Sequence, residues 1–203
     1  MNAAAIDLPP SIAAAPLEGG FYAGRILVAG ILYALIVSPK AEGERKAGVW
    51  SKSYDSVDAL SWNDGQANTA AMAESGSALA KWAQGLRIGG YSDWYIPSQD
   101  ELEICYRCLK PTAEPNYLWS RSGINVSAVP PTYPYAANSP TQTEHELFRA
   151  GGAEAFADEI YWSSTQHASS STYAWYQVFG LGGQGGWRKD NHIRARVVRR
   201  LAI

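Results

Sequence analysis

The chain has 203 residues, 46% of them hydrophobic and 18% charged, and its formal net charge is −2. A chain of this length and composition can bury a substantial core, which excludes extensive disorder. The small net charge gives no overall attraction to nucleic acid or to an anionic membrane. The two cysteines, Cys105 and Cys108, are too few for a disulfide framework, and no basic segment precedes an apolar one at the N-terminus. We therefore expect synthesis in a reducing cytoplasm without a secretory signal.

The N-terminal part of the chain predicts an arm followed by a hairpin. Residues 1–20 are rich in alanine and proline and have no sustained period, which is typical of an extended arm or linker. A single domain is expected over residues 21–203. Two β-branched runs separated at Gly30 predict a hairpin over residues 21–38. The apolar run 26–37 is shorter than the about 20 residues that span a bilayer, so membrane insertion is not expected.

Two helical regions are expected in the middle of the chain. Between residues 66 and 86 apolar residues fall at helical spacings but are interrupted at Gly76, which predicts one interrupted helix or two short ones. Ser98 and Glu101 form a capping box at the start of the next helix, which should stop at Pro111.

The C-terminal half is expected to contain a long loop and then strands. Prolines recur between residues 111 and 152, which excludes regular central strands there and indicates a long, ordered loop. Three strand-like runs follow at residues 160–164, 173–179 and 193–201, separated by glycine-rich or polar turns.

Three motifs, in this order, resemble a known family. They are GGYSDWYIPSQDEL at residues 89–102, YWSST at residues 161–165 and RARVVRR at residues 194–200. Together they resemble the DUF1566 family, which is related to the C-terminal domain of the Legionella collagen-like protein, and the similarity extends upstream through residues 33–37 and 80–83. The resemblance implies an α+β, C-type-lectin-like domain in which two helices pack on small antiparallel sheets with long loops. It also implies a role in receptor or surface recognition, and members of this kind are often encoded by tailed phages and prophages.

The segment that would carry recognition lies near the C-terminus. In a subset of such phage proteins a retroelement rewrites the codons of the last strands and loops, and the corresponding segment here is residues 167–192. Trp175 and Phe179 are expected to be framework residues. The candidate receptor-binding residues are mixed in character: His167, Ser169, Ser171, Tyr176, Gln177, Leu181, Gly185, Trp187, Asp190, Asn191 and His192. The alternative interpretation is that this segment only forms polar turns and the edge of a sheet.

Trp187 is the most informative single residue of this segment. It follows the glycine-rich run 182–186, which argues against burial by neighbouring structure, and a tryptophan presented in this way suits a binding hot spot. Two alternatives stay open, because the ring could fold back over the sheet or lie in a subunit interface. Along a regular strand only one of Tyr176 and Gln177 can face solvent.

No metal, cofactor or catalytic site is predicted. Residues 114–116 (Glu-Pro-Asn) and 62–64 (Trp-Asn-Asp) are the tripeptides that ligate calcium and sugar in calcium-dependent C-type lectins. Their order along the chain is reversed, so we interpret them as a bend and a turn. Cys105 and Cys108 follow acidic residues inside a predicted helix and are interpreted as buried thiols. No serine lies in a nucleophile elbow.

The basic C-terminal end could suggest nucleic-acid binding. Arg194, Arg196 and Arg200 would share one face of a regular strand. We expect these arginines instead to pair with acids near Asp100 and Glu101 while their stems cover apolar surface, so no nucleic-acid partner is predicted.

These features predict a binding protein and not an enzyme. The leading hypothesis is a phage tail or baseplate protein that recognises a host cell-surface protein or glycan, with the N-terminal arm fastening it to other tail proteins of the virion. Several copies are expected, with a trimer favoured, because multivalency raises avidity. The alternatives are a structural baseplate component without host contact, and an enzyme that resembles the formylglycine-generating sulfatase activators. Those enzymes depend on C-terminal cysteines, and this chain has none after Cys108.

Overall fold

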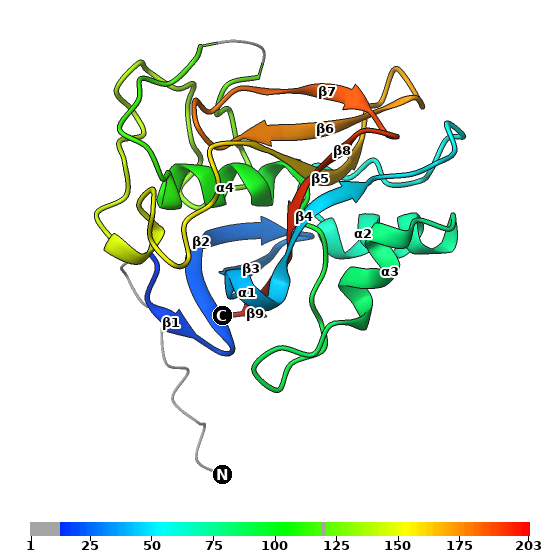
Figure 1. Cartoon of the computed structure of the whole chain (residues 1–203), viewed down its shortest axis with the longest axis horizontal. Coiled ribbons are helices and arrows are strands. Elements are labelled where there is room, and N and C mark those ends of the chain that lie inside the picture. Colours follow the sequence, from blue (N-terminus) through cyan, green and yellow to red (C-terminus); the bar gives the residue numbers. More distant parts are fainter. Residues whose placement is uncertain (1–12, 119–120) are drawn as a thin grey trace.

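The computed structural model describes residues 13–118 and 121–203 (Figure 1). The strands are β1 (Pro16–Leu17), β2 (Gly20–Val28), β3 (Ile31–Val37), β4 (Glu44–Val49), β5 (Ile160–Gln166), β6 (Tyr173–Val178), β7 (Gln184–Arg188), β8 (His192–Arg196) and β9 (Val198–Ala202). The helices are α1 (Lys40–Gly43), α2 (Gly65–Glu74), α3 (Ala78–Gly85), α4 (Gln99–Leu109) and the 3-10 turn η1 (Glu146–Phe148). Among the described residues, no helix is both long and apolar enough to cross a membrane.

The strands form two small sheets, and the helices pack beside them. One sheet has the order β1-β2-β3-β9 and the other the order β4-β8-β5-β6-β7. Neighbouring strands are antiparallel except for one parallel contact between β5 and β8. The predicted α+β class, with a few helices and small, mainly antiparallel sheets, is confirmed. The first strands of the domain and the last strand share one sheet, because β3 pairs with β9.

Local sequence signals explain the elements that were predicted correctly. The β2–β3 hairpin turns at Ala29 and Gly30, whose φ angles of 49° and 80° match the left-handed conformation of a tight hairpin turn. Gly76, with φ 95°, separates α2 from α3, so the region forms two short helices. At the start of α4 the Ser98 hydroxyl accepts from the Glu101 amide at 3.3 Å, and the Glu101 carboxylate accepts from the Ser98 amide at 2.8 Å. This is the predicted capping box.

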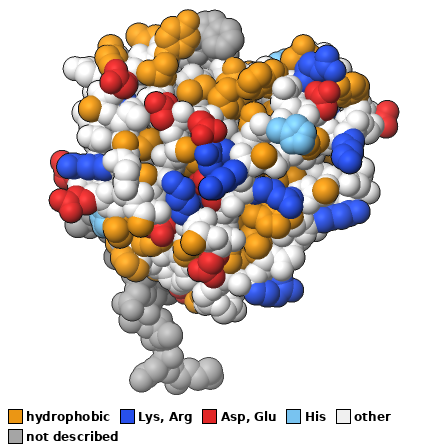
Figure 2. Space-filling view, viewed as in Figure 1, with side chains coloured by type: hydrophobic (Ala, Val, Ile, Leu, Met, Phe, Trp, Pro, Cys, Tyr) orange, Lys and Arg blue, Asp and Glu red, His pale blue; other side chains and the backbone are white. Residues whose placement is uncertain are grey.

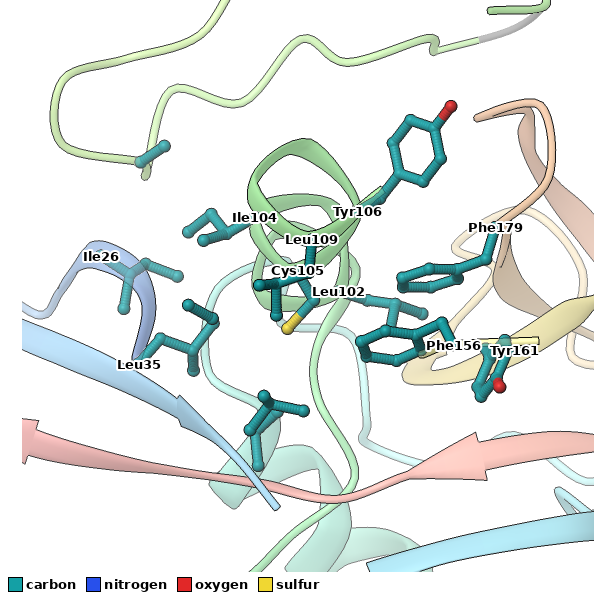
Figure 3. Packing of buried hydrophobic residues seen from close by; sticks show 14 of the residues in the cluster. Ile26, Leu35, Leu102, Ile104, Cys105, Tyr106, Leu109, Phe156, Tyr161 and Phe179 are labelled. Carbon is teal, nitrogen blue, oxygen red and sulfur yellow. The ribbon is translucent and has the colours of Figure 1, made fainter. Parts of the chain in front are cut away.

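Helix α4 lies at the centre of the larger of two core regions. Figure 3 shows Leu102, Cys105 and Leu109 pointing from α4 toward side chains of the β2–β3 hairpin and of the segment around Phe156. Phe156 and Phe179 stack with ring centroids 3.9 Å apart. The second core region lies around Trp50, Trp94 and Trp162, three fully buried side chains, and helices α2 and α3. Because burial of large aromatic side chains dominates core energetics, these two clusters fix the sheets relative to the helices.

The predicted N-terminal arm extends too far into the chain. Ala14 is fully buried, its amide donates to the Tyr22 carbonyl at 2.7 Å, and β1 pairs with β2. Residues 13–20 are therefore part of the domain, because the short β1 strand covers the edge of the first sheet. Residues 1–12 lie outside the described residues.

The predicted strand over residues 193–201 is in fact two strands in different sheets. Val197 separates β8 from β9, and its amide donates to the Gly43 carbonyl at 2.9 Å instead of continuing either ladder. Arg194 and Arg200 therefore do not share a strand face. Each C-terminal arginine has its own acidic partner, and Arg200 pairs with Asp64 at 3.0 Å.

The described residues of the long loop between α4 and β5 contain no strand, as its prolines predict. The backbone forms isolated pairs, including Asn125 with Thr132, and the side-chain Nδ2 of Asn125 donates to the Asp100 carbonyl and to the Glu103 carboxylate, both at 2.9 Å. These contacts tie the loop to α4.

Candidate functional site

The predicted contact segment forms the outermost part of the second sheet. Strand β7 is the edge strand of that sheet and pairs only with β6 among the described strands. Figure 2 shows hydrophobic side chains exposed along the upper edge of the molecule, where Figure 1 places β6, β7 and, at the left, part of the loop between α4 and β5. Gln184 and Gly185 are buried, whereas Gly186, Trp187 and Arg188 are exposed, so the C-terminal half of this edge strand is accessible to a partner.

On one face of β7, Trp187 lies against Tyr176. Trp187 pairs with Ala174 in the ladder, so its ring is on the same face as Tyr176, and the two ring centroids are 6.0 Å apart. Trp187 is 39% exposed, whereas Tyr176 is half-buried against the core around Trp162, and burial raises the pKa of the Tyr176 phenol. The Trp187 ring thus has one side packed and one side free, as expected of a hot-spot residue.

At the C-terminal end of β7 lies a second aromatic residue, Tyr54, which is distant from β7 in the sequence. The Tyr54 hydroxyl donates to the Asp190 carboxylate at 2.6 Å and accepts a hydrogen bond from Arg188. Arg188 also pairs with Asp190 at 3.2 Å, and its guanidinium lies over the Tyr54 ring at 5.3 Å. The hydrogen bond from Tyr54 and the charge of Arg188 hold the pKa of Asp190 below its usual value. We call Tyr54, Tyr176, Trp187, Arg188 and Asp190 the β7 surface.

A buried lysine fastens the segment that carries Tyr54. Lys189 is fully buried, and its ammonium donates to the Gln166 side chain at 2.6 Å and to the Asp55 carbonyl at 3.1 Å. It also lies over the Trp50 ring at 4.5 Å. Gln166 in turn accepts from the Val57 amide at 2.8 Å. The polar segment 51–57 is thereby held against the end of the sheet.

The opposite face of the β6–β7 hairpin carries a chain of stacked rings. His167 stacks on Trp175 with centroids 5.1 Å apart and an angle of 14°, and Trp175 contacts Trp62 at 5.1 Å. The Arg121 guanidinium lies 4.2 Å over the Trp62 ring and pairs with Asp100 at 2.7 Å. These half-buried side chains cover the N-terminal end of α4. Trp175 therefore acts as framework, as its position in the sequence predicts.

Two of the predicted contact residues are wrong because they are buried. Gln177 has no exposed surface, and its side-chain Nε2 donates to the Gly182 carbonyl at 2.8 Å. It points to the opposite face from Tyr176, which is half-buried. Gly185, which pairs with Tyr176, is also buried. Neither residue can contact a partner directly.

The remaining predicted residues are accessible but do not form one cluster. Leu181 is 43% exposed, but it lies at the other end of the hairpin, where its carbonyl accepts from the Tyr117 amide at 2.7 Å. His192 is exposed at the start of β8. The residues of the two turns near the end of β7 are exposed or half-buried: His167, Ser169, Ser171, Asp190 and Asn191.

Tyr54 and Arg188 were missed by the sequence analysis. Tyr54 lies in a polar segment without periodicity, and only the tertiary contacts of Lys189 and Asp190 bring it to the sheet. Arg188 belongs to the basic C-terminal run of the sequence, but nothing in that run distinguishes its partner from those of the other arginines. No local signal in the sequence identifies either residue.

The side chains weighed as metal ligands have structural partners. The side-chain Oδ1 of Asn116 accepts from the Tyr106 hydroxyl at 2.6 Å and from Lys110 at 2.9 Å, and the Asp64 carboxylate caps α2 by accepting from the Ala67 amide at 3.0 Å. Among the described residues, no group of three or more His, Cys, Asp or Glu side chains is arranged to hold a metal ion.

The two cysteines lie in different environments. Cys105 is fully buried, as expected, and burial raises the pKa of its thiol. Cys108 is only partly buried, although the same effect raises the pKa of its thiol to about 12. Because the thiolate is the reactive form, both thiols are poor nucleophiles near neutral pH.

Comparison with known proteins identifies a family. No curated protein matches the chain. A solved structure of a fimbrial protein from Bacteroides ovatus is similar at 13% sequence identity and a TM-score of 0.46, over 91% of this chain but only 45% of that protein, a likeness too low to support any conclusion. The family model of the Lcl C-terminal domain matches residues 44–199, from the first residue of β4 into β9. The chain therefore belongs to the Lcl C-terminal domain family, as the three sequence motifs predict.

Proposed function

We propose that this chain is a phage tail or baseplate protein that binds a host cell-surface molecule through the β7 surface. The observation that carries the proposal is the exposure of Trp187 and Tyr54 at a sheet edge, where neither ring is needed to complete the core. Tryptophan, tyrosine and arginine are the residues that most often dominate binding energy at interfaces. Membership of the Lcl C-terminal domain family supports a surface or adhesin-like role.

We also propose a C-type-lectin-like fold and an oligomeric assembly on the virion. The fold is supported by the pairing of β3 with β9, which joins the two ends of the domain, and by the long loop between α4 and β5. A homo-oligomer, with a trimer favoured, would present several β7 surfaces and raise the avidity of a modest single-site affinity. We propose no catalytic activity; a cysteine nucleophile in particular is disfavoured, because burial raises the pKa of both thiols.

The test is adsorption of virions that carry Trp187→Ala or Tyr176→Ala to host cells. We expect the fraction of adsorbed particles to fall about tenfold for Trp187→Ala, since truncating a hot spot typically costs more than 1 kcal/mol, with normal particle yield. Tyr133→Ala is the matched control, because Tyr133 is 79% exposed on the loop between α4 and β5. Particles that fail to assemble while the purified variant still binds cells would instead support a structural baseplate component.

A further inference from the structure

We draw no further inference here: the strongest candidate, the patch of exposed cations formed by Arg45, Lys46 and Lys52 on and after the edge strand β4 and by Lys81 and Arg87 in and after α3, makes no ion pair within the described part of the chain, but charged side chains on an outer strand also protect its edge from pairing, and nothing in the structure shows what covers the patch.

Discussion

Lys189 is a buried cation whose neighbours are mostly neutral. Its ammonium contacts the Gln166 amide oxygen, the Asp55 carbonyl and the Trp50 ring, and the Asp55 carboxylate is the charged group that opposes the effect of burial. Burial lowers the pKa of Lys189 from 10.5 to about 8. The contacts of the Lys189 ammonium position segment 51–57. Burial of its positive charge nevertheless lowers the free energy of unfolding at neutral pH.

This lysine predicts a pH dependence of stability. Between pH 8 and 10.5 the unfolded chain retains the Lys189 proton that the folded chain releases, so the contribution of this group to the free energy of unfolding increases as pH rises through that window. Urea unfolding at pH 7, 8 and 9 should show a stability that rises relative to the Lys189→Met variant over this range. A constant difference between the two proteins across these pH values would contradict the lowered pKa.

Residue chemistry alone does not locate the proposed binding surface. Tyr176 and Gln177 are neighbours in the sequence and both suit recognition, yet Tyr176 is half-buried and Gln177 is fully buried. Alternation predicts that only one of them faces solvent, but which one depends on where the core lies, and a single sequence does not specify that. Tyr54 shows the same limit, since its contacts are all made with residues far along the chain.

Elements with a local signal were predictable, and those that depend on their neighbours were not. The β2–β3 hairpin and the start of α4 follow from turn and capping residues. Strand β7 has the sequence QGGWR, and glycine disfavours strands, so its conformation depends on pairing with β6. The change of sheet at Val197 likewise depends on tertiary contacts. The alternation of polar and apolar residues along the sequence does not reveal it.

The contact between α2 and α4 depends on the absence of a side chain at Gly65. A Cβ at this position would lie 2.3 Å from the Glu101 carboxylate and 2.5 Å from the Ser98 amide, the two groups of the capping box. Gly65→Ala should therefore lower the free energy of unfolding by about 1–3 kcal/mol, as overpacking usually does. Gly85→Ala is the control at the end of α3, where a Cβ meets nothing within 4 Å, and it should be neutral or stabilising by at most about 1 kcal/mol. Equal stabilities of the two variants in urea unfolding would rule out this account.

At the scale of the whole molecule, the family match and the folding unit have different boundaries. The match begins at residue 44, but three of the four strands of the first sheet and part of the larger core come from residues before it. Strand β3 pairs with β9, and Ile26, Leu35 and Val37 are buried against α4 and its surroundings. The strands that precede the match are thus integral to the domain.

A fragment of residues 44–203 should therefore not fold cooperatively. Removing β1, β2 and β3 exposes one edge of β9 and one side of α4, and the lost burial exceeds the marginal stability of a domain of this size. Circular dichroism during heating should show no sharp transition for this fragment, whereas a chain that starts at Ala13 keeps every contact described here and should unfold as the full chain does. A cooperative transition of the short fragment near the normal midpoint would show that β1–β3 are dispensable.

The position of the β7 surface at a sheet edge has a consequence for mutational tolerance. Replacing Trp187 or Asp190 alters a side chain that is largely outside the core, whereas replacing Gln177 or Gly185 alters a buried position. A library randomised at the exposed positions should contain many folded members, and one randomised at the buried positions few. The exposed positions at the edge of this sheet can therefore change at little cost in stability, while the buried positions beside them keep the framework constant.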